Sequence, residues 1–163
     1  MNKISVLDTP TLKTKPLFNI RVTLRDPLNV GISYAGHRII YDVESGIVEG
    51  KKVKGKLKPS GGDWVIRHPD GTFTLDVKIC IETDDGAMIF LSWRGRLVIP
   101  EHLIGKVISK DTCDEVDKDE YYFRNLIMIE TGDERYQWLN NIVAISQGQL
   151  IPEGIQYYVM EVL

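Results

Sequence analysis

One stretch of the chain, Gly61–Arg94, limits the possible folds more than any other. It contains three apolar-rich segments joined by two turns that both end in Asp-Gly, at Pro69-Asp70-Gly71 and at Asp84-Asp85-Gly86. Three-residue loops of this kind are typical of β-hairpins, because a type I turn followed by a left-handed glycine reverses the chain between two strands. The stretch therefore predicts three consecutive antiparallel strands.

The same loops predict which residues face each other across the hairpins. With three-residue loops, Trp64 lies opposite Asp76, and Asp76 lies opposite Arg94 on one mixed face. A two-residue first loop would instead place Trp64 opposite Val77, so the register depends on the loop length. The other face is strongly apolar and holds Val65, Leu75, Val77, Ile79, Ile81, Ile89, Leu91 and Trp93.

Outside this stretch, period-two alternation and turn residues predict several more strands. We expect turns or loops at residues 26–29, 31–36 and 111–119, a helix of about two turns beginning near Pro100, and a short helical turn at residues 135–139. The further strands are expected at residues 17–24, 38–43, 47–49, 53–58, 120–130, 140–146 and 155–163. About nine short strands with one short helix favour an all-β, mainly antiparallel barrel, with a sandwich as the alternative.

Length and charge narrow the classes of protein. At 163 residues the chain has the size of one domain, expected over residues 1–163 with residues 1–15 as a loose N-terminal segment. A net charge of −3 gives no basic excess, so nucleic acid is not expected as a partner. No segment reaches the roughly 20 apolar residues of a membrane span, and the start lacks a signal-peptide core. We therefore expect a cytoplasmic protein without a membrane partner.

The cysteines and histidines predict no metal site and no cofactor. Cys80 and Cys113 are far apart in the sequence and lack CxxC spacing, so they form no metal or redox motif. Reduced thiols are expected from the cytoplasmic location. His37, His68 and His102 form no HxH or HxxxH pair. The glycines make no phosphate-binding loop either.

Many short motifs, in order along the chain, resemble one bacterial family. They are Pro59-Ser60-Gly61-Gly62-Asp63-Trp64, Asp70-Gly71-Thr72 followed by Leu75-Asp76, Thr83-Asp84-Asp85-Gly86-Ala87, Arg94-Gly95, Tyr121-Tyr122-Phe123-Arg124, Glu130-Thr131-Gly132-Asp133 and Tyr136-Gln137-Trp138-Leu139-Asn140. This set resembles the family known as domain of unknown function 3237, from about Leu17 to Val162. The resemblance implies a single-domain, closed or nearly closed calycin-like β-barrel of about 8–10 strands, similar in outline to small-molecule binders. The family's general activity is not settled.

Two charged pairs are candidate site residues, each with a structural alternative. Asp76 and Arg94 could bind an anion or a carbonyl group, but an ion pair bracing two strands is the favoured interpretation. Arg124 and Glu130 share one face of a strand with Tyr122 and could act as a substrate clamp and a general base. A half-exposed strand carries the same residues for solubility, and both interpretations stay open.

Four further candidates come from turns and aromatic positions. Asp63 beside Trp64 could orient a ligand under the indole ring, or could bond to the backbone of the Gly61-Gly62 turn. Trp138 suits the core or a lid better than a stacking platform, and Asn140 could donate to a carbonyl or cap the preceding turn.

These residues support three functional hypotheses. The first is a small-molecule-binding barrel whose lining includes Asp63, Trp64, Asp76, Arg94, Tyr122, Arg124, Glu130, Trp138 and Asn140. The second is a cofactor-free isomerase, lyase or hydratase, in which Asp76 or Glu130 moves a proton and an arginine stabilises an enolate-like oxygen. The third is a structural protein that uses a sheet face to form a homodimer without any ligand.

Overall fold

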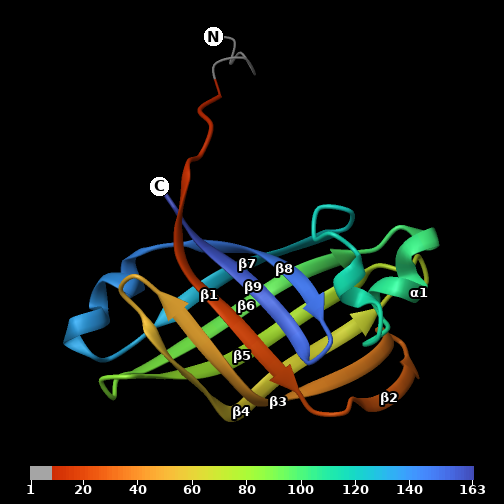
Figure 1. Ribbon diagram of the computed structural model, residues 1–163, viewed down its shortest axis with the longest axis horizontal. Coiled ribbons are helices and arrows are strands. Elements are labelled where there is room, and N and C mark those ends of the chain that lie inside the picture. The colour runs from red at the N-terminus through yellow and green to blue at the C-terminus, as the bar shows by residue number, and fades with distance from the viewer. Residues whose placement is uncertain (1–8) are drawn as a thin grey trace.

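The computed structural model describes residues 9–163 (Figure 1). It contains a nine-stranded antiparallel sheet and four short helical segments. The strands are β1 (Thr14–Leu24), β2 (Leu28–Ser33), β3 (Gly36–Gly50), β4 (Lys54–Arg67), β5 (Phe73–Thr83), β6 (Met88–Val98), β7 (Tyr122–Glu130), β8 (Ala144–Ile151) and β9 (Gly154–Val162). The helical segments are η2 (Glu101–Leu103), α1 (Ile104–Val107), η3 (Cys113–Glu115) and η4 (Glu134–Asn141).

Strand β1 closes the sheet into a barrel. The strand order is β1-β9-β8-β7-β6-β5-β4-β3-β2, and β1 pairs with β3 as well as with β9. Strand β2 pairs with the beginning of β3 outside this circuit, so eight strands form the closed wall. The predicted closed antiparallel barrel is confirmed. Figure 1 shows α1 at one end of the barrel and the segment 134–141 at the other.

The predicted hairpins of Gly61–Arg94 are confirmed in detail. Gly71 and Gly86 have φ angles of 83° and 87°, as a type I turn followed by a left-handed glycine requires. Val77 faces Trp93 and Asp76 faces Arg94 across β5 and β6. Strand β4 pairs with β5 in the predicted register from Gly61 to Arg67, and the register shifts between Leu57 and Gly61.

The apolar face of these strands points into the barrel and the mixed face points outward. Ile79, Ile81 and Leu91 are at most 1% exposed, whereas Arg94 on the other face has a side chain that is 82% exposed. Burying one such aliphatic side chain contributes about 1.5–3 kcal/mol. The interior of an eight-stranded barrel is just wide enough for its side chains to fill, so these inward-facing apolar residues form the core.

Several predicted boundaries were wrong. Residues 31–36 were expected to form a loop, but strand β2 occupies Leu28–Ser33, since its backbone pairs with β3 at the sheet edge. The strands expected at 38–43 and 47–49 are one strand, β3. The strand expected at 140–146 begins only at Ala144, because η4 extends to Asn141, and it runs through Gly148.

Both helical segments predicted from the sequence lie at the expected positions. Segments η2 and α1 together cover Glu101–Val107, where about two turns were expected, and η4 contains the turn expected at 135–139. The loose segment expected at 1–15 falls partly on residues 1–8, outside the described residues, and β1 already begins at Thr14. None of the helices described in residues 9–163 has the length and apolarity needed to cross a membrane.

Candidate functional site

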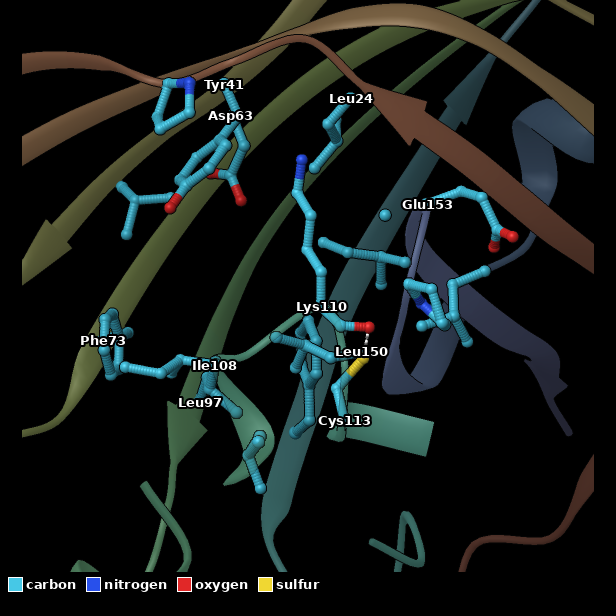
Figure 2. A pocket seen from close by; sticks show the side chains of 18 of the residues that line it. Leu24, Tyr41, Asp63, Phe73, Leu97, Ile108, Lys110, Cys113, Leu150 and Glu153 are labelled. Carbon is cyan, nitrogen blue, oxygen red and sulfur yellow. Dashed lines mark hydrogen bonds between the residues drawn. The ribbon is translucent and has the colours of Figure 1, made fainter. Parts of the chain in front are cut away.

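A cavity of about 290 Å³ opens at the end of the barrel where α1 and η3 lie (Figure 2). The barrel strands supply one side, and the segment from Val107 to Cys113 supplies the other. Most of the wall is apolar, which favours a ligand with little charge. The apolar wall includes Val65, Phe73, Leu75, Leu97, Phe123 and Ile155.

Asp63 is a buried acid in the wall of this cavity. Asp63 is only 5% exposed, because β4 directs its side chain inward together with that of Val65. The preceding glycines allow this position: Gly61 has a φ of 90°, and a Cβ there would lie 2.0 Å from the Lys78 carbonyl oxygen. A Cβ on Gly62 would lie 2.5 Å from the Tyr41 carbonyl oxygen. The two glycines therefore bring β4 close to both neighbouring strands just before Asp63.

The surroundings of the Asp63 carboxyl favour its protonated form. Burial raises its pKa from 3.8 to about 7, against the opposing effect of a hydrogen bond from the Asp76 backbone N–H to Oδ1, 3.1 Å long. The negative charge of Asp76 adds to the increase. Among residues 9–163, no lysine, arginine or histidine side chain forms an ion pair with Asp63. The carboxyl is therefore close to half protonated at neutral pH.

Tyr41 lies next to this carboxyl. It is directly opposite Asp63 in the β3–β4 ladder, and both residues line the cavity. Figure 2 shows the two side chains beside each other on the same wall. Burial, and then the charge of Asp63, raises the pKa of the Tyr41 hydroxyl above its ordinary value of 10.0. Tyr41 thus keeps its proton at neutral pH and can donate a hydrogen bond.

Asp63 also borders a second, very small space deeper in the barrel. This void of about 10 Å³ is lined by Trp93 and Tyr157 as well as by Asp63. Tyr157 packs edge-on against Trp93, with ring centroids 5.1 Å apart, and its pKa is raised well above 10.0 by burial and then by the charge of Asp63. Trp93 Nε1 is buried without a hydrogen-bond partner among the described residues. The inner side of Asp63 thus borders an uncharged space that is lined by aliphatic side chains and by the aromatic rings of Trp93 and Tyr157.

The mouth of the cavity is polar. Arg25, Lys110 and Glu153 line it, and Lys110 lies 3.9 Å from the carboxylate of the exposed Asp26. The Cys113 thiol is buried beside this mouth, where burial and then the charge of Asp114 raise its pKa. A thiol with a raised pKa is a poor nucleophile.

Residues 12–162 match the model of the family described as "Protein of unknown function (DUF3237)". The chain belongs to this family. The resemblance predicted from the sequence motifs is therefore confirmed, and it covers nearly the whole barrel.

The names of the following relatives state no activity. A UPF0311 protein of Rhodopseudomonas palustris strain TIE-1 is 37% identical over 132 residues, which are 80% of this chain and 84% of the relative. A crystal structure of a conserved protein of unknown function from Rhodopseudomonas palustris superposes with a TM-score of 0.87 at 32% identity, covering 95% of this chain and all of that one. A β-barrel-like protein from Acinetobacter baumannii AYE gives 0.80 at 29% identity, covering 96% and 99% of the two chains. These relatives agree with the barrel fold.

Of the nine predicted site residues, the DUF3237 barrel places only Asp63 at the cavity. Trp64, Asp76, Arg94, Tyr122, Arg124 and Glu130 occupy the outward-facing positions of β4 to β7. Asp76 and Arg94 do meet, at 3.9 Å, but Asp76 is closer to Lys78, at 2.9 Å. This group has the geometry of a surface ion pair.

The remaining predicted residues also have contacts outside the cavity. Arg124 stacks on the ring of Tyr122 and is not brought to Glu130, which lies at the other end of β7. The Asn140 side chain forms two hydrogen bonds with the backbone of Thr131: it accepts one from the N–H at 2.8 Å and donates one to the carbonyl oxygen at 2.9 Å. Trp138 lies under the ammonium group of Lys52. Ligand binding by these residues stays a prediction.

Sequence reasoning missed Tyr41, Trp93 and Tyr157 as site residues. One signal could have found them: Asp63 has the same strand parity as Val65, so the predicted register already placed an acid on the apolar face. An acid at an inward position needs polar neighbours.

Within residues 9–163, no group of three or more His, Cys, Asp or Glu side chains is arranged to hold a metal ion.

Proposed function

We propose that the barrel binds a small, mostly apolar organic molecule that carries one carbonyl or hydroxyl group. The observation that supports this proposal is a cavity of about 290 Å³ with a mostly apolar wall that contains the buried carboxyl group of Asp63. Among the described residues, this carboxyl group forms no ion pair. Small-molecule sites combine an apolar lining with a few well-placed polar groups, and this volume is near the lower end of their range of about 300–1,000 Å³.

The polar groups define the expected ligand more closely. A protonated Asp63 can donate to a carbonyl oxygen, and an ionised Asp63 can accept from a hydroxyl group. Tyr41, on the opposite strand, supplies a second donor beside it. A fully ionised ligand group next to Asp63 would meet no cation there, so the charged side chains at the mouth are better placed for any charged end of the ligand.

A matched pair of tryptophan substitutions tests the proposal. Leu97 lines the cavity, whereas its neighbour Val98 is 39% exposed on the outer face. The probe is 2-tetralone, a compact bicyclic ketone, with binding measured by isothermal titration calorimetry. Leu97→Trp should fill the cavity and weaken binding at least about tenfold, which corresponds to about 1.4 kcal/mol. Val98→Trp should leave binding within about twofold of wild type, a change of less than about 0.5 kcal/mol.

Thermal unfolding of both variants checks that the barrel is intact. Equal affinities in the two variants, or no binding of 2-tetralone to the unmodified chain, would contradict the proposal. Saturation transfer from the inward methyl groups of Leu75 and Val65 to the ligand provides an independent test of where the probe sits.

Two further expectations remain proposals. A cytoplasmic location is supported by the two free cysteines, Cys80 and Cys113. Homodimer formation is supported by Leu126 and Met128, which are 54% and 52% exposed on the outer face of β7. Sedimentation velocity of the chain and of Leu126→Glu tests the homodimer: a monomer in both would contradict it.

A further inference from the structure

We propose that Asp63 and Tyr41 form a proton-transfer pair that shifts the double bond of a small unsaturated ketone held in the cavity. This inference rests on the proposed ligand binding and adds a reaction to it. The substrate class is a β,γ-unsaturated ketone of one or two rings, and the product is the conjugated α,β-unsaturated ketone. The reaction requires neither a metal nor a cofactor.

The pairing of β3 with β4 supplies the geometry. Tyr41 and Asp63 are directly opposed in an antiparallel ladder, where the Cβ atoms of such partners lie about 4.5–5.5 Å apart. Both line the same cavity, and Figure 2 shows both side chains on one wall of it. One bound ketone can therefore contact the acid with its carbon atoms and the phenol with its oxygen.

The hydrogen bonds of Asp63 leave one oxygen for the substrate. Its Oδ1 accepts the Asp76 backbone N–H, which holds the carboxyl group in place. Among the described residues, no hydrogen bond engages Oδ2. A fixed carboxylate with one unengaged oxygen next to an apolar cavity can act as a positioned general base.

The reaction is a balanced proton shift. The Asp63 carboxylate takes a proton from the carbon between the carbonyl group and the double bond. The electron pair of that C–H bond forms a new C=C bond, and the carbonyl oxygen becomes a dienolate oxygen that accepts a hydrogen bond from the Tyr41 hydroxyl. The protonated Asp63 then returns the same proton to the γ carbon, while the C=O bond reforms. Asp63 ends as a carboxylate, and no other reactant is consumed.

Burial gives both groups suitable acidity. An Asp63 pKa of about 7 makes this carboxylate a stronger base than an exposed aspartate, and it is still ionised in about half of the molecules at neutral pH. Tyr41 stays protonated because its pKa is raised. The charged or titratable groups that face Asp63 are Tyr41 from β3, Asp76 from β5 and Tyr157 from β9. Arg25, Lys110 and Glu153 also line this cavity, at its mouth. Neither Arg25 nor Lys110 forms an ion pair with Asp63 among the described residues, so the effect of burial on the Asp63 pKa is not offset by a paired cation.

The test uses the purified full chain and cyclohex-3-enone. Formation of cyclohex-2-enone is followed by the ultraviolet absorbance of the conjugated product. Asp63→Asn should lower the rate at least about 100-fold, because it removes the base, and Tyr41→Phe should lower it about 10- to 100-fold. Asp42→Asn is the matched control, since Asp42 is exposed on the opposite side of β3 from Tyr41. Its rate should match that of the unmodified chain.

Three measurements separate failure of this inference from failure of ligand binding. If the unmodified chain binds 2-tetralone but does not accelerate the isomerisation, the inference is overturned and the binding proposal stands. Absence of 2-tetralone binding overturns both. Asp63→Asn should bind 2-tetralone within about threefold of the unmodified chain, since it keeps the shape of the carboxyl; a large loss of binding together with rate would assign Asp63 to binding alone.

The pH profile of the unmodified chain provides a test that needs no variant. The rate should rise with pH through an apparent pKa of about 7 and then level off, as ionisation of Asp63 requires. Deuterium uptake from D₂O into 2-tetralone, followed by NMR, should show the same dependence. A rate that does not change between pH 5 and pH 9 would exclude Asp63 as the base.

Discussion

Tyr41 and Asp63 are directly opposite each other on adjacent strands, with a phenol and a carboxyl group sharing one wall of the barrel cavity. Burial raises the pKa of both groups, and the negative charge of Asp63 raises the pKa of Tyr41 further. In an otherwise apolar wall, such a pair costs stability, and proteins retain that kind of cost mostly at functional positions.

The free energy cost of burying the ionised Asp63 carboxyl group should make the stability of the barrel depend on pH. The folded-state pKa of Asp63 lies near 7, above its unfolded value of 3.8, so between these values the folded chain holds a proton that the unfolded chain has lost. The free energy of unfolding therefore falls as pH rises through this interval. In Asp63→Asn this fall is absent, so between pH 5 and pH 8 the variant should gain about 2 to 3 kcal/mol relative to wild type. Urea unfolding at the two pH values measures this gain. A constant difference would show that Asp63 titrates normally.

Gly61 should not tolerate a side chain. Its φ of 90° is unfavourable for alanine, and the added Cβ would collide with the Lys78 carbonyl oxygen. Gly61→Ala should destabilise the barrel by about 2 kcal/mol or more, measured by chemical denaturation. Gly132→Ala is the control, because Gly132 has no positive φ and no atom within 4 Å of an added Cβ. Equal stabilities of the two variants would contradict this account of the Gly61 backbone.

Asn140 is expected to stabilise the end of the barrel opposite the cavity. Its two hydrogen bonds to the Thr131 backbone attach η4 to the end of β7. Asn140→Ala should lower the free energy of unfolding by about 1–3 kcal/mol, because a backbone N–H and a carbonyl both lose their partner. Asn141→Ala, an exposed neighbour in the same helix, should change it by less than about 0.5 kcal/mol. Differential scanning calorimetry of both variants distinguishes the two effects.

The pair of Asp76 and Arg94 allows a direct test of the outer face as a ligand site. Arg94 is almost fully exposed and its nearest contact with Asp76 is 3.9 Å, so Arg94→Ala should change stability by less than about 0.5 kcal/mol. Its affinity for 2-tetralone should equal that of the unmodified chain. A tenfold loss of affinity would instead support ligand binding by Asp76 and Arg94.

Local turn chemistry made part of the fold predictable. The loops at Gly71 and Gly86 each set a hairpin register without reference to distant residues, and both registers hold. Strand β2 gave no such signal, since Val30 and Ile32 are exposed and no inward face creates an alternation. The pairing of β1 with β9 joins segments at the two ends of the chain, and no local pattern encodes it.

The candidate site was harder to predict than the fold. The register separated an apolar face from a mixed face. Because the mixed face carries the charged side chains, Asp76 and Arg94 were predicted as candidate site residues, but both side chains face water. Asp63 was the informative residue because it interrupts the apolar face. Its neighbour Tyr41 comes from another strand, and Tyr157 comes from the last one. Only the closed barrel brings the three together.

Closure by β1 also has a consequence for synthesis of the chain. Because β1 lies between β3 and β9, the wall around Asp63 is incomplete until the last residues leave the ribosome. Until Tyr157 is in place, water can reach the Asp63 carboxyl, and an ordinary, ionised aspartate is expected. Docking of β9 should therefore be accompanied by uptake of a proton from the solvent near neutral pH. The raised pKa of Asp63 is therefore expected only after the complete chain has folded.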